Sequence, residues 1–353
     1  MIIQTAPAGA PRLAIMMHEH TALSGQFARA FGNERFEPAA PVELMAYVVS
    51  HHDAGWAEFD RDPVTDEKTA LPYNLIETPA AHITVTSRKS PDFNERQHPY
   101  CGLMSSMHSW GLYNGRYGLS KLVLIEKFPP QERPLADRML EGELERQKRL
   151  KAELGKTAET ARWIEQTHLF QNYKQLQFFD TLALYFNRIH PHERVEQEFE
   201  HVPLDAQHDV SIRIRPRREG IYELAPYPFA ADNAEFAYAG RPITPAQRQH
   251  DGGWSTVLRT LPHNGKASAW LRRDQADSVA ASINWRSRCV SVSTSAPRRR
   301  SSRPARSSAL SSRATASRRL LTRAAISACT GGGVTTACFG LAASGRDSRS
   351  SSA

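Results

Sequence analysis

The chain has few cysteines, no long hydrophobic run and no clear leader segment, and each absence excludes a class of protein. Only one cysteine, Cys101, precedes residue 286, so a disulfide framework is excluded for most of the chain. No run of about 18 apolar residues occurs, so no transmembrane helix is predicted. Residues 1–5 lack a basic region followed by an apolar core, which is a poor secretion signal. We therefore expect a cytoplasmic protein that does not associate with membranes.

Lysine and acidic residues almost vanish after residue 285. Residues 286–353 contain 13 arginines, no lysine and one acid, Asp347. This segment carries a net charge of +12, which leaves −4 for the rest of a chain whose total is +8. A segment so rich in Arg, Ser and Ala cannot bury enough apolar area to fold. The composition predicts one domain over residues 1–285 and a disordered tail over residues 286–353.

The tail has two interpretations. Its arginines would attract nucleic-acid phosphates without regard to sequence. Alternatively, it is the out-of-frame translation of a GC-rich gene, with an insertion or deletion near the codons for residues 255–290. The abrupt boundary, the absence of lysine and the lack of interleaved aromatic residues favour the second interpretation. We therefore expect no nucleic-acid partner beyond non-specific attraction to the tail, and resequencing of the gene distinguishes the two.

Histidine and aspartate residues lie on four predicted apolar helices that are far apart in the sequence. Helical spacing puts His20 on one face with Leu23 and Phe27. Asp180 is the one carboxylate on the apolar stripe of its helix, and a buried carboxylate needs a cation or a hydrogen-bonded neighbour. The full set is His20 in 18–32, His52 and Asp53 at the end of 42–53, His108 in 100–113 and Asp180 in 163–189.

Short strands are also predicted. Residues 1–3 and 13–17 are apolar and flank a turn rich in Pro and Gly, and residues 210–215 alternate apolar and basic side chains. Together with later short segments up to residue 240, these strands predict one small antiparallel sheet beside a mainly α-helical bundle.

Imidazole nitrogens and carboxylate oxygens are good ligands for divalent metals of intermediate hardness. A set without sulfur leaves open positions on the metal for water and for a substrate oxygen. The sequence therefore predicts a centre with one or two divalent ions, Mn, Fe, Mg, Ni or Zn. Asp53 could bridge two metals and is the candidate catalytic residue.

The order of these residues resembles that of the HD-domain superfamily of metal-dependent phosphohydrolases. In more detail, residues 1–270 resemble the small bacterial family DUF3891. The segments that carry the resemblance are His20 to Gly25, His52 to Trp56, Ser106 to Tyr113 and Leu176 to Tyr185.

The resemblance implies an HD-like helical bundle with His20, His52, Asp53 and Asp180 as metal ligands. Binuclear members of the superfamily have further histidines between the His-Asp pair and the last Asp, and His82 and His108 lie at these places in the sequence order. His82 is the weaker of the two, because its segment, residues 81–89, has mixed polarity.

The function expected from this centre is hydrolysis of a small phosphorylated or otherwise anionic molecule by a metal-activated water. Four residues are candidates for binding the substrate anion, namely Tyr113, Asn114, Arg116 and Lys174. Two alternatives stay open. The same ligand order resembles that of HD-fold diiron oxygenases, and a third possibility is a non-catalytic binding module that contains a metal. The sequence does not indicate an oligomeric state.

Overall fold

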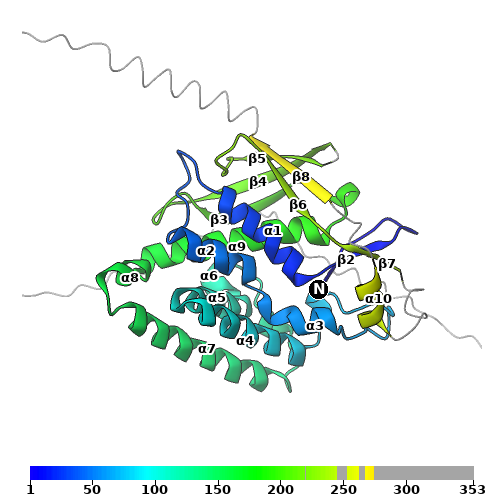
Figure 1. Ribbon diagram of the computed structural model, residues 1–353, viewed down its shortest axis with the longest axis horizontal. Coiled ribbons are helices and arrows are strands. Elements are labelled where there is room, and N and C mark those ends of the chain that lie inside the picture. The colour runs from blue at the N-terminus through cyan, green and yellow to red at the C-terminus, as the bar shows by residue number, and fades with distance from the viewer. Residues whose placement is uncertain (219, 245–252, 262–266, 274–353) are drawn as a thin grey trace, which may run out of the picture. The chain divides into compact units, whose positions relative to one another are not determined.

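The computed structural model describes residues 1–218, 220–244, 253–261 and 267–273 (Figure 1). About 52% of these residues are helical and about 18% are in strands. The predicted boundary at residue 286 and the predicted disordered tail lie outside the described residues. In the described part of the chain, no helix is long and apolar enough to cross a membrane.

Six helices of ten or more residues occur in the described part of the chain. They are α1 (Met17–Ala30), α2 (Val42–His51), α4 (Ala80–Gln97), α5 (Pro99–Tyr113), α7 (Arg133–Leu154) and α9 (Gln166–Arg188). The shorter helical segments are η1 (Ala54–Trp56), α3 (Ala57–Arg61), η2 (Leu75–Glu77), α6 (Gly115–Gly118), η3 (Leu124–Lys127), α8 (Ala158–Trp163), η4 (Pro191–Glu193) and α10 (Trp254–Thr260).

Helix α5 lies in the interior of the helical layer, because its residues are apolar or small on every side. Nearly every residue from Tyr100 to Gly111 is buried, which is the pattern of a helix surrounded by other elements. Helices α4, α7 and α9 pack around it. Helix α7 buries only one stripe, with Ala136, Met139 and Leu150 among its members, and exposes most of its charged residues, Glu143 being the buried exception in the described chain.

Two sheets flank the helices. The first has three antiparallel strands in the order β1 (Ile2–Ile3), β2 (Arg12–Ile15) and β7 (Arg241–Ile243). The second has five strands in the order β3 (Gln197–Pro203), β4 (Asp209–Arg218), β5 (Ile221–Ala225), β8 (Ala267–Arg273) and β6 (Asn233–Tyr238). Strands β5 and β8 are parallel, whereas the other neighbours are antiparallel.

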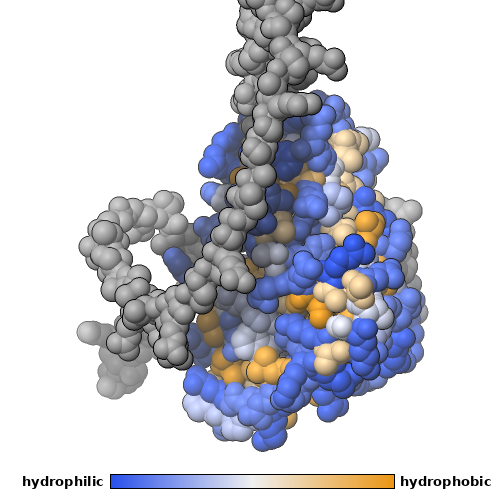
Figure 2. Space-filling model, turned by 90° about the vertical axis from the view of Figure 1, so that its left-hand side faces the viewer, coloured by the Kyte–Doolittle hydropathy of each residue, from blue (hydrophilic) through white to orange (hydrophobic). Residues whose placement is uncertain are grey.

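Helices α1 and α9 lie between the five-stranded sheet and the layer of α4, α5 and α7 (Figure 1). The main hydrophobic core fills this space, and a smaller core joins the three-stranded sheet to Trp254 of α10. The face drawn in Figure 2 is largely hydrophilic, with hydrophobic residues only in small groups. Burial of the large apolar side chains thus fixes α1 and α9 in the interior.

The prediction of a mainly α-helical HD-like bundle with one small antiparallel sheet is wrong. The described part of the chain forms two sheets, one of them a curled half-barrel, and strands make up nearly a fifth of its residues. Among the described residues, the N-terminal strands β1 and β2 pair with each other and β2 pairs with β7 at residues 241–243, and neither pairs with the 210–240 region. The segments before residue 210 and after residue 240 supply the strands that the prediction lacked, β3, β7 and β8.

Candidate metal centre

His20 lies in the first turns of α1, where the side chain is fully buried. Helical spacing carries it inward with Leu23 and Phe27, as its sequence position predicts. Its Nδ1 lies 3.0 Å from Asn187 Oδ1, and its Nε2 lies 3.2 Å from Asp180 Oδ1. The oxygen of Asn187 accepts the Nδ1 proton, so the lone pair of Nε2 faces the centre.

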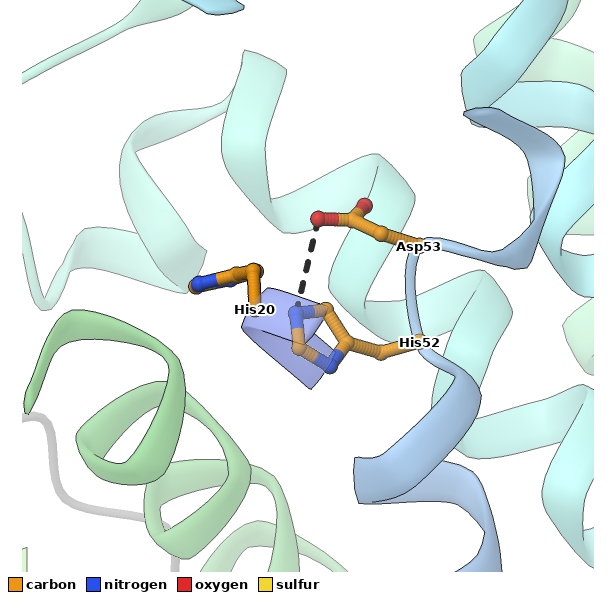
Figure 3. A group of neighbouring side chains, drawn as sticks. All are labelled: His20, His52 and Asp53. Carbon is orange, nitrogen blue, oxygen red and sulfur yellow. Dashed lines mark ion pairs between the residues drawn. The ribbon is translucent and has the colours of Figure 1, made fainter. Parts of the chain in front are cut away.

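His52 and Asp53 lie at the turn that follows α2. The His52 Nδ1–H donates to the carbonyl oxygen of Val49 at 2.8 Å. The His52 Nε2 is buried and has no hydrogen-bond partner among the described residues. It lies 3.5 Å from Asp53 Oδ2 and 3.7 Å from Asp180 Oδ1 (Figure 3 draws the first contact). An orphaned nitrogen between two carboxylates is what a site for a metal ion provides.

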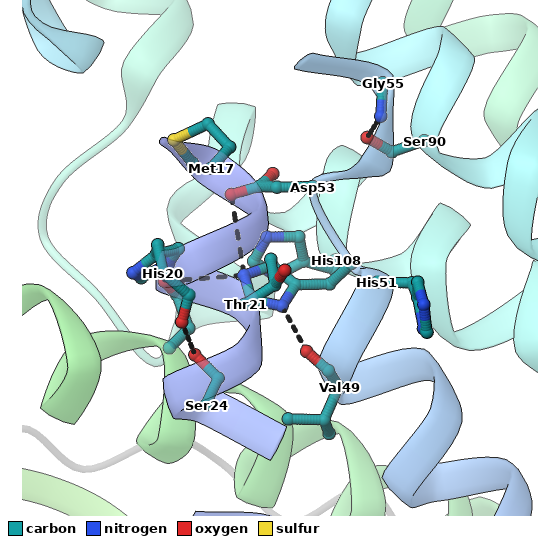
Figure 4. A network of polar contacts seen from close by, with 12 residues as sticks. Met17, His20, Thr21, Ser24, Val49, His51, Asp53, Gly55, Ser90 and His108 are labelled. Atoms are coloured by element: carbon teal, nitrogen blue, oxygen red, sulfur yellow. Dashed lines mark hydrogen bonds and ion pairs between the residues drawn. The ribbon is translucent and has the colours of Figure 1, made fainter. Parts of the chain in front are cut away.

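Gly55 allows this turn to approach α4. A Cβ at this position would lie 2.2 Å from the carbonyl oxygen of Thr86, so only glycine fits. The Gly55 N–H also donates to Ser90 Oγ at 3.0 Å (Figure 4). These contacts hold the segment that carries His52 and Asp53 against the helical core.

His108 of α5 is buried and completes the histidine set. The side-chain amide of Gln177 lies 2.8 Å from His108 Nδ1 through its nitrogen, while Gln177 Oε1 has no partner in the described chain. If the amide turns about its terminal bond, Oε1 accepts a hydrogen bond from a protonated Nδ1 at the same place. In that orientation each of the three histidines donates a hydrogen bond from Nδ1 to a partner outside the centre and directs Nε2 into the centre. Metal-bound histidines have this arrangement.

Five of the predicted ligands meet at one place. The ligand atoms of His20, His52 and Asp53 lie within 4.8 Å of one another, and so do those of His52, His108 and Asp180. The ring centroids of His20 and His52 are 5.5 Å apart, and those of His52 and His108 are 4.9 Å apart. Residues from four helices, α1, α2, α5 and α9, thus converge as the sequence predicts.

The electrostatics of the centre favour a cation. Burial raises the pKa of Asp180, but the neighbouring His20 and His52 rings outweigh it and hold that pKa well below the usual value. Burial lowers the pKa of His52, yet the carboxylates of Asp53 and Asp180 raise it to about 9. Burial, together with the charge on His52, lowers the pKa of His108 to about 3, so this ring is neutral. Burial raises the pKa of Asp53.

His82 is not brought to the centre. It lies on α4, is half-buried, and its ring contacts the edge of Phe59 at a centroid distance of 5.1 Å. It belongs to neither group of neighbouring ligand atoms in the described residues. The predicted segment of mixed polarity is in fact a regular helix, whose orientation directs His82 toward the α3 segment.

Three of the four predicted substrate-binding residues have other partners. The Lys174 ammonium pairs with Asp209 of β4 at 2.5 Å, because six residues of helix rotate it about 120° from Asp180. The Tyr113 hydroxyl bonds Ser87 Oγ at 3.1 Å, and the Asn114 amide donates to the Trp110 carbonyl at 3.0 Å at the end of α5. These three are not available to hold an anion at the centre.

Arg116 reaches the centre but contacts a ligand. Its Nη2 lies 3.7 Å from Asp180 Oδ2, on the side away from His20. Arg116 and Tyr117 both adopt left-handed backbone conformations, with φ of 52° and 59°. Each costs roughly 1–2 kcal/mol in a residue other than glycine. The strained turn therefore positions a guanidinium that orients Asp180.

Sequence reasoning did not identify Asn187. It lies seven residues, about two helical turns, after Asp180 on the same face of α9, and it is fully buried. The spacing i, i+7 between a candidate ligand and a buried amide is a signal that the sequence contains. The carboxamide oxygen orients His20, as a partner of a ligating histidine does.

Comparison with known families assigns the first two thirds of the chain. Residues 1–245 match the family described as "Protein of unknown function (DUF3891)". No curated protein and no solved structure gave a significant match. The matched region contains every residue of the centre, from His20 to Asn187. The chain that builds this cluster of histidines and carboxylates belongs to the DUF3891 family.

Proposed function

We propose that the protein is a metal-dependent hydrolase that acts on small anionic substrates such as phosphoesters. The observation that carries the proposal is the buried Nε2 of His52, which has no hydrogen-bond partner in the described chain and lies between the carboxylates of Asp53 and Asp180. Leaving a buried polar atom unpaired costs about 1–3 kcal/mol, and a bond from this nitrogen to a cation would remove that cost. The proposed ligand order, His20, His52-Asp53 and Asp180, is that of the HD-domain superfamily.

The geometry favours one ion. His52 is common to both groups of ligand atoms, and its Nδ1 is already bonded to the Val49 carbonyl. It can therefore bind only one ion, through Nε2, and the two groups describe the surroundings of that ion. A diiron oxygenase would need ligands for a second ion, and His82 is not near enough to the described ligands to contribute. The hydrolase is thus preferred to the oxygenase.

The bound ion would supply a Lewis acid that polarises a substrate oxygen and lowers the pKa of a coordinated water. The chain's own residues would do the rest. His20, His52, His108 and Asp180 are buried and rigidly held, whereas the Asp53 side chain is 16% exposed and is the most accessible of the five. Its Oδ1 points away from His52 (Figure 3) and could accept a proton from the attacking water. Arg116 keeps Asp180 oriented.

Metal titration tests the proposal directly. We expect the wild-type protein to bind one divalent ion per chain from the group Mn, Fe, Mg, Ni and Zn. His52→Ala and Asp180→Ala should weaken binding by more than about 100-fold, since even the outer partners of ligands contribute about 10–100-fold. His82→Ala is the matched control and should bind the ion as the wild type does. Circular dichroism checks that each variant is folded.

Release of inorganic phosphate from a panel of phosphomonoesters then tests the hydrolase. Activity should depend on the added ion and disappear in Asp53→Asn. A wild-type protein that binds no divalent ion, or a folded His52→Ala variant that keeps its ion, contradicts the metal centre. Two irons per chain would favour the oxygenase instead.

A further inference from the structure

A cavity of about 510 Å³ opens beside Asp53, between α1 and α2. This volume suits a small molecule. The wall contains Asp53 itself and Thr21, the neighbour of the ligand His20, so the cavity adjoins the metal centre. Its polar residues are His18, Thr21, Gln26, Arg29, Ser50, His51, Asp53 and Asp60. None of the four substrate-binding residues predicted from the sequence belongs to it.

The acidic residues of the cavity are already engaged. Asp60 Oδ2 accepts the Met17 N–H at 2.6 Å, and Asp60 Oδ1 lies 3.0 Å from the amino nitrogen of Met1. Asp53 faces His52 and, in the proposed function, the ion. Arg29, by contrast, is exposed, has no carboxylate within ion-pair distance among the described residues and hydrogen-bonds Ser50 Oγ at 3.4 Å. The cavity therefore has a solvent-accessible guanidinium in its wall as well as the candidate metal centre.

The position of the Arg29 guanidinium follows from helix geometry. The side chain runs back along α1, so that Nη1 would lie 3.2 Å from a Cβ placed on Gly25. Gly25 is four residues from Thr21, which corresponds to about 6 Å along the helix axis. The guanidinium thus lies about one helical turn from the part of the cavity that adjoins the metal centre.

A larger open depression of about 720 Å³ between α4 and α7 lacks this property. Most of its charges are paired with one another, because Arg146 contacts Asp92 and Glu95, and Arg149 contacts Glu95 at 2.6 Å. Arg96 also lines it and lies 5.5 Å from the centre of the Phe93 ring. None of its lining residues belongs to the metal centre, so the cavity beside Asp53 is the one that adjoins the candidate ion.

We propose that Arg29 is a specificity-determining residue that binds a second anionic group on the substrate, about one helical turn from the group that reaches the metal centre. The substrate class is then a small molecule with two anionic groups, one of them the phosphoryl group that is hydrolysed. This inference rests on the proposed function. Ser50, which accepts a hydrogen bond from Arg29, holds the guanidinium at the cavity edge.

Two non-hydrolysable probes test the proposal, phenylphosphonate and 4-carboxyphenylphosphonate, which differ only in the second anion. Calorimetry on the Mn²⁺-loaded wild type should give a Kd about ten-fold lower for the carboxylate compound, which is the contribution of one charge-assisted contact. Arg29→Ala should abolish this advantage, and Arg29→Glu should reverse it. Arg138→Ala removes an exposed arginine of α7 and should leave the ten-fold advantage intact.

The possible failures are distinguishable. Metal content is measured on every sample before ligand is added, so a wild type without bound ion overturns the proposed function itself. Arg29→Ala with a full complement of ion and an undiminished ten-fold advantage overturns the role of Arg29. Equal affinity of the metal-loaded wild type for the two probes, or binding of neither, also overturns it.

Discussion

Glu143 is a buried carboxyl on α7, and its protonation should make the stability of the protein depend on pH. Burial raises its pKa to about 7 from 4.5, against the opposing effects of Ser106 and Arg146. Between pH 4.5 and 7 the unfolded chain loses this proton first, so the free energy of unfolding falls as pH rises and stays low above pH 7. We expect Glu143→Gln to raise the free energy of unfolding at pH 8 by up to about 3 kcal/mol.

The same substitution should have little effect at pH 4.5, where Glu143 is neutral in the folded protein. Urea unfolding at both pH values measures the difference. Glu145→Gln changes an exposed neighbour on α7 that pairs with Lys148 at 3.8 Å, and it should have little effect at either pH. A stability gain for Glu143→Gln that is equal at both pH values would contradict a protonation effect.

At the scale of single residues, the sequence predicted which histidines and aspartates meet better than it predicted their hydrogen-bond partners. Histidine and aspartate on apolar helix faces are rare, and His20, His52, Asp53, His108 and Asp180 all lie within the cluster that the structure brings together. The substrate residues were predicted from proximity in sequence alone, which gives no direction to a side chain. The angular position of each residue around α9 would have distinguished Gln177, which faces His108, from Lys174, which faces β4.

The close packing of α1 on α2 depends on Gly25. A Cβ there would lie 2.0 Å from Ser50 Oγ and 3.0 Å from Ser50 Cβ. We expect Gly25→Ala to destabilise the protein by about 1–3 kcal/mol, because overpacking at this contact outweighs the higher helix propensity of alanine. Urea unfolding measures the change, and metal affinity should fall with it because the two helices carry His20 and His52.

A second substitution identifies the cause. Ser50→Gly removes the clashing atoms, so the Gly25→Ala and Ser50→Gly pair should lose less stability together than the sum of the single changes. Gly142→Ala on α7 is the control, because a Cβ at this exposed position meets nothing within 4 Å. That change should stabilise the protein by roughly 0.5–1 kcal/mol. Strict additivity of the first pair would exclude the steric explanation.

At the scale of elements, hydrophobic periodicity predicted the helices whose inner faces are apolar. Helix α1 begins at Met17, one residue before the predicted start, and α9 begins within three residues of the predicted one. Helix α4 was not predicted because its buried face is largely Thr and Ser, whose hydroxyls bond backbone carbonyls within the helix. Strand β3 was not predicted because exposed charged residues interrupt it. Such elements depend on tertiary contacts that no local pattern contains.

At the scale of the whole molecule, the region that matches the family does not contain the complete larger sheet. Strand β8, at residues 267–273, lies between β5 and β6 and pairs with every residue of β6. We expect a chain ending at residue 245 to be much less stable than one ending at residue 273. Without β8, strand β6 loses its neighbour in the sheet and two edges are exposed to aggregation.

Solubility and urea unfolding of the two shortened chains measure this difference. The buried Leu271 offers a milder test, since Leu271→Ala in the full chain should cost about 2–5 kcal/mol. Equal stability of the chains ending at 245 and at 273 would contradict a structural role for β8.

The three histidines of the centre differ in what fixes their rings. His20 depends on the Asn187 side chain and His108 on that of Gln177, whereas His52 is held by the main-chain carbonyl of Val49. Any amino acid at position 49 provides the same carbonyl. A substitution of Asn187 or Gln177 can therefore loosen one ring each, whereas the carbonyl that anchors the His52 ring survives any change of side chain at position 49.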